Sequence, residues 1–258
     1  MESKINRHLT LIPVILVSLY YCLVSATPQH GGDHFVLVHG GGHNVTAVDL
    51  AASGIDLRRA ESLRSFAQYI GPLMSLMETL SEDEKVILVA HSLGGLAISK
   101  AMEIFHDKIH MAIFVTALMP SLAFNFTILS QGLARWQALQ LDSKAASTHY
   151  PINTVILIFV TLIFEDVELA ELLVRPQRLF SNENIYTSLV LTPERFGSVN
   201  RIFVLSDKDR TLVKEFQLWM IKNNPPNHVE HIQDSDHMVM ISKPDLGDYL
   251  LSLAKKFA

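Results

Sequence analysis

Short apolar runs that fit β-strands alternate along most of the chain with longer stretches in which apolar residues recur at helical spacing. The runs predict strands near residues 35–38, 45–50, 86–89, 111–116, 201–205 and 228–232. The helical spacing predicts helices within residues 57–80, 95–105, 213–222 and 245–257. Strands and helices that alternate in this way predict an α/β fold, in which a mainly parallel sheet is covered by helices on both faces.

The stretch from about residue 120 to residue 197 breaks this alternation. We predict that it forms a cap inserted into a single domain that spans residues 33–258. Within it, residues 155–164 contain only one polar side chain, Thr161, but ten residues are too few to cross a membrane. We expect them to form a buried strand or helix, and a pocket-lining or lipid-contacting role is the alternative.

Residues 1–26 have the three-part layout of a secretory signal peptide. Lys4 and Arg7 give a positive start, residues 9–23 are almost continuously apolar, and small residues precede a cleavage site after Ala26. We therefore expect cleavage and secretion. Retention in a membrane by the uncleaved leader is one alternative, because the apolar run approaches the ~17 residues that span a bilayer. A cytosolic protein is the other.

Composition narrows the classes of partner. Hydrophobic residues make up 49% and charged residues 18%, which argues against disorder. The net charge of −5, without a basic block, argues against nucleic acid as a partner. Cys22, the single cysteine, lies in the leader, so the mature chain has no thiol for a disulfide, a nucleophile or a metal site. We expect no membrane partner after cleavage, and a homodimer is left open.

Two glycosylation sequons begin at Asn44 and Asn125. They become acceptor sites only if the chain enters the secretory pathway. Glycosylation at these sequons therefore depends on a functional signal peptide, and the sequons support the prediction of that peptide only weakly.

A candidate nucleophile follows the strand predicted at residues 86–89. The sequence continues as Ala90-His91-Ser92-Leu93-Gly94-Gly95 and then into a helix. This strand–turn–helix setting is that of the nucleophile elbow, G-x-S-x-G, with alanine in place of the first glycine. Small neighbours are needed because the turn is strained and the strand and helix approach closely. The pattern predicts that Ser92 is a catalytic nucleophile.

A serine nucleophile needs a base and an orienting acid, which follow it along the chain in the order acid, then histidine. Asp209 lies in the loop after the strand at residues 201–205, and Asp207 in the same loop is its rival. His237 follows the last strand and precedes the final helix. His91 flanks the nucleophile, and we expect it to pack against the elbow instead of acting as the base.

A tetrahedral intermediate needs two N–H donors to its oxyanion. We expect one from Leu93, the residue after the nucleophile, and the other from Gly41 in the glycine run after the first strand. This chemistry requires no metal and no organic cofactor, only a small-molecule ester substrate.

Several motifs resemble those of the plant methylesterase family, which includes salicylic acid-binding methylesterases, polyneuridine aldehyde esterase and related hydroxynitrile lyases. They lie at residues 34–40, 49–54, 91–95, 173–176, 196–199, 215–217 and 236–238. The resemblance implies an α/β-hydrolase with a helical cap and a triad of Ser92, Asp209 and His237, so it favours Asp209 over Asp207. It also implies hydrolysis of methyl esters of small signalling acids, such as salicylate, jasmonate and indole-3-acetate. The lyase pattern has threonine at Gly40 and lysine at Met238, so the esterase reading is favoured.

The chain departs from the family after its first strand. Only residues 40–44 separate the first two predicted strands, where the family has a helix. Five residues reach at most ~17 Å, which leaves no length for a helix. Either the first helix is absent or the reading frame has lost a segment. A catalytically impaired protein that binds a small acid is therefore the alternative function.

Overall fold

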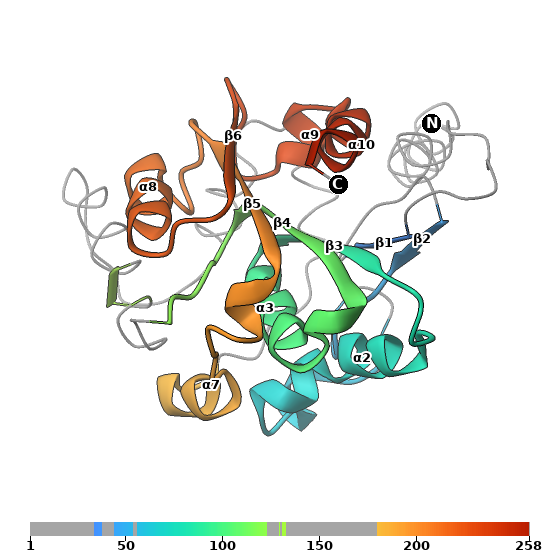
Figure 1. Ribbon diagram of the computed structural model, residues 1–258. Helices are drawn as coiled ribbons and strands as arrows, with labels where there is room; N and C mark the ends of the chain where they lie inside the picture. Colours follow the sequence, from blue (N-terminus) through green and yellow to red (C-terminus); the bar gives the residue numbers. More distant parts are fainter. Residues whose placement is uncertain are drawn as a thin grey trace, which may run out of the picture.

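The computed structural model describes residues 34–37, 44–53, 56–122, 129, 131–132 and 180–257. Six strands form one sheet in the order β2-β1-β3-β4-β5-β6, and every neighbouring pair is parallel (Figure 1). The strands are β1 His34–Leu37, β2 Asn44–Ala47, β3 Val86–Ser92, β4 Ile109–Ala117, β5 Asn200–Ser206 and β6 His228–Ile232. The predicted α/β fold with a parallel sheet is confirmed, and β2 ends earlier than its apolar run predicts.

Most of the helices lie between strands along the chain, and α9 and α10 follow the last strand. The α-helices are α2 Phe66–Thr79, α3 Gly94–Ile104, α7 Asn182–Ser188, α8 Lys214–Asn223, α9 Val239–Ser242 and α10 Leu246–Phe257. Short 3₁₀ turns are η1 Ala60–Ser62, η2 His106–Lys108 and η3 Phe196–Ser198. Two of the helices, α7 and α9, were not predicted, because elements this short show little hydrophobic periodicity.

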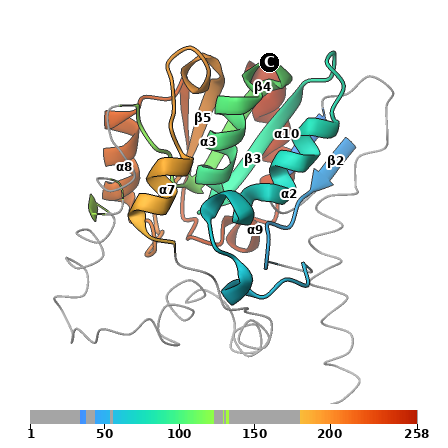
Figure 2. The ribbon, with the colours of Figure 1, turned by 90° about the horizontal axis from the view of Figure 1, so that it is seen from below.

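Helices cover both faces of the sheet. On one face lie α2, α3 and α7, and on the other lie α9 and α10 (Figures 1 and 2). The alternation of side chains along β4 serves both layers: Ala112 and Phe114 pack with the first group, and Ile113 and Val115 with the second. Because β4 is buried on both faces, its sequence is a continuous apolar run instead of an alternating one.

The first long helix begins later than predicted. Periodicity suggested a helix within residues 57–80, but α2 starts at Phe66. Ser65 ends the preceding segment by accepting the Gln68 N–H over 3.2 Å with its hydroxyl, and Asn184 of α7 accepts the Phe66 N–H over 2.7 Å. These two caps satisfy N–H groups that the helix itself leaves unpaired. Apolar spacing carries no information about such caps.

Strands β1 and β2 are parallel neighbours in which His34 pairs with Asn44. Residues 38–43, which join them, lie outside the described residues, so the predicted loss of the first helix stays a prediction. Four other predicted features also lie outside the described residues: the predicted signal peptide at residues 1–26, the apolar segment at residues 155–164, the sequon at Asn125 and most of the cap.

Helix α3 passes very close to the end of β4. A Cβ atom built on Gly95 would lie 2.1 Å from the Leu118 carbonyl oxygen and 2.9 Å from its carbonyl carbon. Because these are backbone atoms, no rotation of a side chain can make room. Only glycine at residue 95 lets the helix approach the strand this closely.

We predict that Gly95→Ala lowers the free energy of unfolding by about 3 kcal/mol, at the upper end of the usual cost of overpacking. Gly197→Ala is the matched control, because a Cβ there would meet its nearest atom, the Thr192 carbonyl oxygen, at 3.7 Å. That variant should stay within about 0.5 kcal/mol of the parent. Urea unfolding followed by circular dichroism measures both, and equal stabilities would contradict the close approach of α3.

Candidate active site

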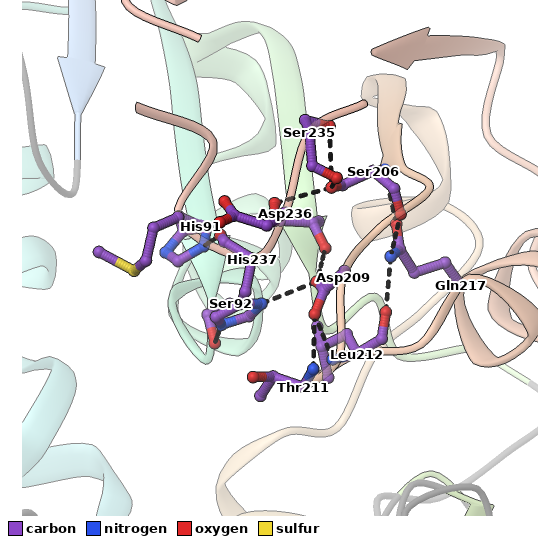
Figure 3. Close-up of polar contacts among 12 residues, drawn as sticks. His91, Ser92, Ser206, Asp209, Thr211, Leu212, Gln217, Ser235, Asp236 and His237 are labelled. Atoms are coloured by element: carbon purple, nitrogen blue, oxygen red, sulfur yellow. Dashed lines mark hydrogen bonds and ion pairs between the residues drawn. The ribbon is translucent and has the colours of Figure 1, made fainter. Parts of the chain in front are cut away.

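Ser92 occupies a tight turn between the end of β3 and the start of α3 (Figure 3). Its φ is 53°, in the left-handed region that costs a non-glycine residue about 1–3 kcal/mol. The Leu118 N–H donates to the Ser92 carbonyl oxygen over 2.9 Å and helps to hold the turn. The backbone at Ser92 is therefore strained and braced from β4, as a nucleophile elbow requires.

His237 lies between Ser92 and Asp209 (Figure 3). Its Nε2 is 3.1 Å from Ser92 Oγ, and its Nδ1 is 2.8 Å from Asp209 Oδ2. Since Asp209 can only accept at Oδ2, the ring carries its proton on Nδ1, and Nε2 is left to accept the proton of the serine hydroxyl. The structure thus brings together the three residues that the sequence singled out, from three separate loops.

The Asp209 carboxylate is buried and surrounded by hydrogen-bond donors. Oδ1 accepts the N–H groups of Thr211 over 2.7 Å and Leu212 over 2.8 Å. Oδ2 accepts the Thr116 hydroxyl as well as the His237 Nδ1–H. Four donors compensate for the loss of water around a carboxylate whose side chain is 0% exposed. They also fix the plane in which the carboxylate meets the imidazole.

Asp207, the rival acid, serves a different contact. Its Oδ1 accepts the Asp234 N–H over 2.9 Å, and its Oδ2 lies 3.4 Å from His231 Nε2. It therefore connects the loop after β5 to β6 and to the loop that carries His237. The geometry agrees with the family resemblance in assigning the contact with His237 to Asp209.

Further contacts join the same two loops. Lys208 donates its N–H to the Ser235 carbonyl oxygen over 2.9 Å, and its ammonium lies 2.7 Å from Asp234 Oδ1. The hydrogen bond from Lys208, and then its charge, lowers the pKa of Asp234, and the same contact raises the pKa of Lys208. Both side chains are exposed, so water screens the pair and its stabilising effect is small. The buried contacts of Ser206, whose hydroxyl lies 2.7 Å from the Ser235 carbonyl oxygen, hold the loops more firmly.

Gln217 of α8 hydrogen-bonds to both ends of the loop that contains Asp209. Its Nε2 donates to the carbonyl oxygens of Ser206 over 2.9 Å and Leu212 over 2.6 Å, and its Oε1 accepts the Ser206 N–H over 3.1 Å (Figure 3). A fully buried amide thus bonds to the backbone at both ends of the loop. No role for this residue is predicted from the sequence, although residues 215–217 are among the motifs that carry the family resemblance.

His91, which we expected to pack against the elbow, packs against His237 of the candidate triad. Its Nε2–H donates to the His237 carbonyl oxygen over 2.6 Å, and the centres of the two rings are 4.6 Å apart. The residue before the nucleophile therefore fixes the backbone of the histidine. This bond to the His237 backbone was not predicted.

Leu93 lies at the beginning of α3, directly after Ser92. N–H groups at the start of a helix have no acceptor within the helix, so this one is suited to a developing oxyanion. Gly41, the predicted second donor, lies outside the described residues. The oxyanion site therefore stays a prediction.

Within the described ranges, no group of three or more His, Cys, Asp and Glu side chains is arranged to hold a metal ion. None of the helices in these ranges is both long and apolar enough to cross a bilayer.

Comparisons with known proteins agree with this geometry. Residues 29–246 match the alpha/beta hydrolase family. The chain is 40% identical to methyl jasmonate esterase 1 of Vitis vinifera, across 87% of this chain and 98% of that protein. It is also 40% identical to salicylic acid-binding protein 2 of Nicotiana tabacum, across 88% of this chain and 98% of that protein. The chain belongs to the plant methylesterase family.

Solved structures of other family members have the same fold. Tomato methylketone synthase I in complex with 2-tridecanone superposes with a TM-score of 0.76 and 38% identity, covering 88% of this chain and 99% of that one. Polyneuridine aldehyde esterase gives a TM-score of 0.74 and 32% identity, covering 87% and 100%. The methylketone synthase shares this fold with the polyneuridine aldehyde esterase, so the fold by itself does not select the substrate.

We predict that Asp209→Asn slows the reaction of Ser92 with a serine-directed phosphonate by three to four orders of magnitude. An amide in place of the acid lets the imidazole adopt the wrong tautomer, and comparable triads lose about 10⁴-fold in this way. Asp207→Asn is the matched control and should stay within about threefold, because an amide oxygen still accepts the Asp234 N–H. Mass spectrometry of the labelled protein gives both rates. An equal loss in the two variants would leave Asp209 with no special role.

Proposed function

We propose that the chain is a serine carboxylesterase that hydrolyses methyl esters of small signalling acids, of the methyl salicylate, methyl jasmonate and methyl indole-3-acetate class. One observation carries the mechanism: His237 Nε2 lies 3.1 Å from Ser92 Oγ while its Nδ1 lies 2.8 Å from Asp209. The substrate class is supported by the relatives, two of which are named for jasmonate and salicylate.

The first half of the reaction transfers the acyl group to Ser92. Its Oγ attacks the carbonyl carbon of the ester as its proton moves to His237 Nε2. Asp209 stabilises the imidazolium that forms. The negative oxygen of the tetrahedral intermediate accepts the N–H of Leu93 and, we propose, that of Gly41. When the intermediate collapses, the methoxy oxygen takes the proton from His237 and leaves as methanol.

The second half returns the enzyme to its starting state. A water molecule gives a proton to His237 Nε2 and attacks the acyl carbon. The negative oxygen of the second tetrahedral intermediate is bound in the same oxyanion site. Collapse breaks the bond to Ser92 Oγ, which recovers its proton from His237. The net reaction converts an ester and water into a carboxylic acid and methanol, and it needs no cofactor.

We predict that the purified protein releases methanol from at least one of methyl salicylate, methyl jasmonate and methyl indole-3-acetate, and that Ser92→Ala abolishes this release. His237→Ala should reduce turnover to less than a few per cent while the fold is kept, since His237 Nε2 is the ring nitrogen hydrogen-bonded to Ser92 Oγ. Gas chromatography of methanol, with circular dichroism as the folding control, measures both effects. Turnover that survives in the His237 variant would require another base.

The alternative is that the chain retains the pocket and binds a small acid without turning over its ester. It is favoured by the short connection between β1 and β2, six residues from 38 to 43, which includes the expected donor Gly41. One relative is named salicylic acid-binding protein 2, which makes salicylate a suitable probe. Calorimetric binding of salicylate by a protein that releases no methanol from any of the three esters would support this alternative. Ordinary turnover eliminates it.

We further propose that residues 1–26 are a signal peptide and that the mature protein is secreted. The proposal is supported by the positive start, the apolar run and the small residues before Thr27. We predict that N-terminal sequencing of protein from the natural source reads from Thr27. An intact Met1 in the membrane pellet would instead mean that the leader is an anchor, and an intact, unglycosylated chain in the soluble cytosol would exclude both.

A further inference from the structure

Strand β4 contains one additional residue where it passes the nucleophile turn. Its pairing with β3 steps from Val115 opposite His91 to Ala117 opposite Ser92, so Thr116 has no opposite residue. An extra residue in one strand of a pair is a β-bulge, a feature that redirects a side chain and is common beside active sites.

The bulge reverses the alternation of side chains along β4. Val115 packs with the core under α9 and α10, whereas Phe114 packs with the opposite core. In a regular strand Ala117 would share the face of Val115, but it packs with Phe114. Thr116 is therefore the residue at which the regular alternation of side chains along β4 is interrupted. Its side chain does not have to enter the core layer to which regular pairing would assign it.

The backbone of Thr116 is strained. Its φ is 36°, a value that is a true outlier for a β-branched residue, and its side chain is completely buried. Such strain persists where the surroundings impose it and is often found at functional sites. A threonine at this position has a conformational cost, and the hydrogen bond of its hydroxyl is the interaction that a residue without a hydroxyl would lose.

Residues 116–118 contact both ends of the triad. The Thr116 hydroxyl donates to Asp209 Oδ2, the same oxygen that accepts the His237 Nδ1–H. Two residues later, the Leu118 N–H donates to the Ser92 carbonyl oxygen. The bulge of β4 therefore bonds to the acid and to the nucleophile from one short segment.

We propose that Thr116 is a positioning residue that orients the Asp209 carboxylate toward His237. The inference rests on the proposed function, because it assigns Thr116 to the same triad. Two backbone N–H groups hold Oδ1, but Thr116 is the only described donor to Oδ2 besides His237 itself. Without its hydroxyl, the carboxylate keeps one fixed oxygen and loses the fourth donor that sets the angle of the other.

Loss of the hydroxyl has two measurable consequences. The carboxylate becomes more negative at Oδ2, so it stabilises the imidazolium of His237 more strongly and the ring takes up its proton at higher pH. The imidazole is also less well aligned with Ser92, so acylation slows by about tenfold, the fold-change expected for one hydrogen bond to a charged group. The Michaelis constant should change less than about threefold, because Thr116 does not contact the substrate in this scheme.

The experiment compares Thr116→Val, which keeps the shape and loses the hydroxyl, with Thr116→Ser, which keeps the hydroxyl. The pH titration of the His237 ring is followed by NMR of its Cε1 proton, assigned by comparison with His237→Gln, and turnover of the three methyl esters is followed in parallel. The other titratable groups beside His237 are Asp209, His91 and the adjacent Asp236, and all three are unchanged in both variants. Thr116→Ala replaces the valine variant if that protein does not fold.

An upward shift of the titration midpoint in Thr116→Val, together with a tenfold lower kcat and with Thr116→Ser close to the parent, supports the proposal. An unshifted midpoint in Thr116→Val overturns it, whatever the turnover. If the parent protein turns over none of the esters but the midpoint still shifts, the proposed function fails while the positioning role stands.

Discussion

The buried carboxylate of Asp209 is the interaction on which the site depends. A charge that is removed from water must find donors within the protein, and here they come from β4, from its own loop and from the loop after β6. Satisfying that one group therefore fixes the relative positions of three segments far apart in the sequence. The position of His237 between Asp209 and Ser92 follows from it.

The parallel sheet makes this convergence possible. In parallel strands the carboxyl ends lie at the same edge, so the loops after β5 and β6 start from neighbouring strands and the turn after β3 starts one strand away, across β4. The glycine at residue 95 then lets α3 approach β4 closely, and the strained φ of Ser92 is balanced by the bond from Leu118. Strain at the nucleophile is thus supported by packing elsewhere in the same layer.

Much of this arrangement could be predicted from the sequence, for identifiable reasons. Buried parallel strands leave continuous apolar runs, and Ser92, Asp209 and His237 each follow such a run in a fixed order. The start of α2 at Phe66 could not be predicted, because one of its caps, Asn184, comes from a distant helix. Thr116 and Gln217 were missed for a related reason. A single polar residue in an apolar strand or helix has no spacing pattern, and only the folded chain shows which buried group it satisfies.

The contacts of Gln217 have a consequence for how this protein can change over evolutionary time. Its amide bonds only to backbone atoms of Ser206 and Leu212, so those bonds do not depend on the side chains at the two positions. They do depend on the number of residues between them. Natural variation can exchange side chains such as that of Arg210 in this interval, but an insertion or deletion would separate the amide from one of its partners. Apart from Asp207 and Asp209, whose side chains make the contacts described above, this loop is therefore constrained more in its length than in its composition.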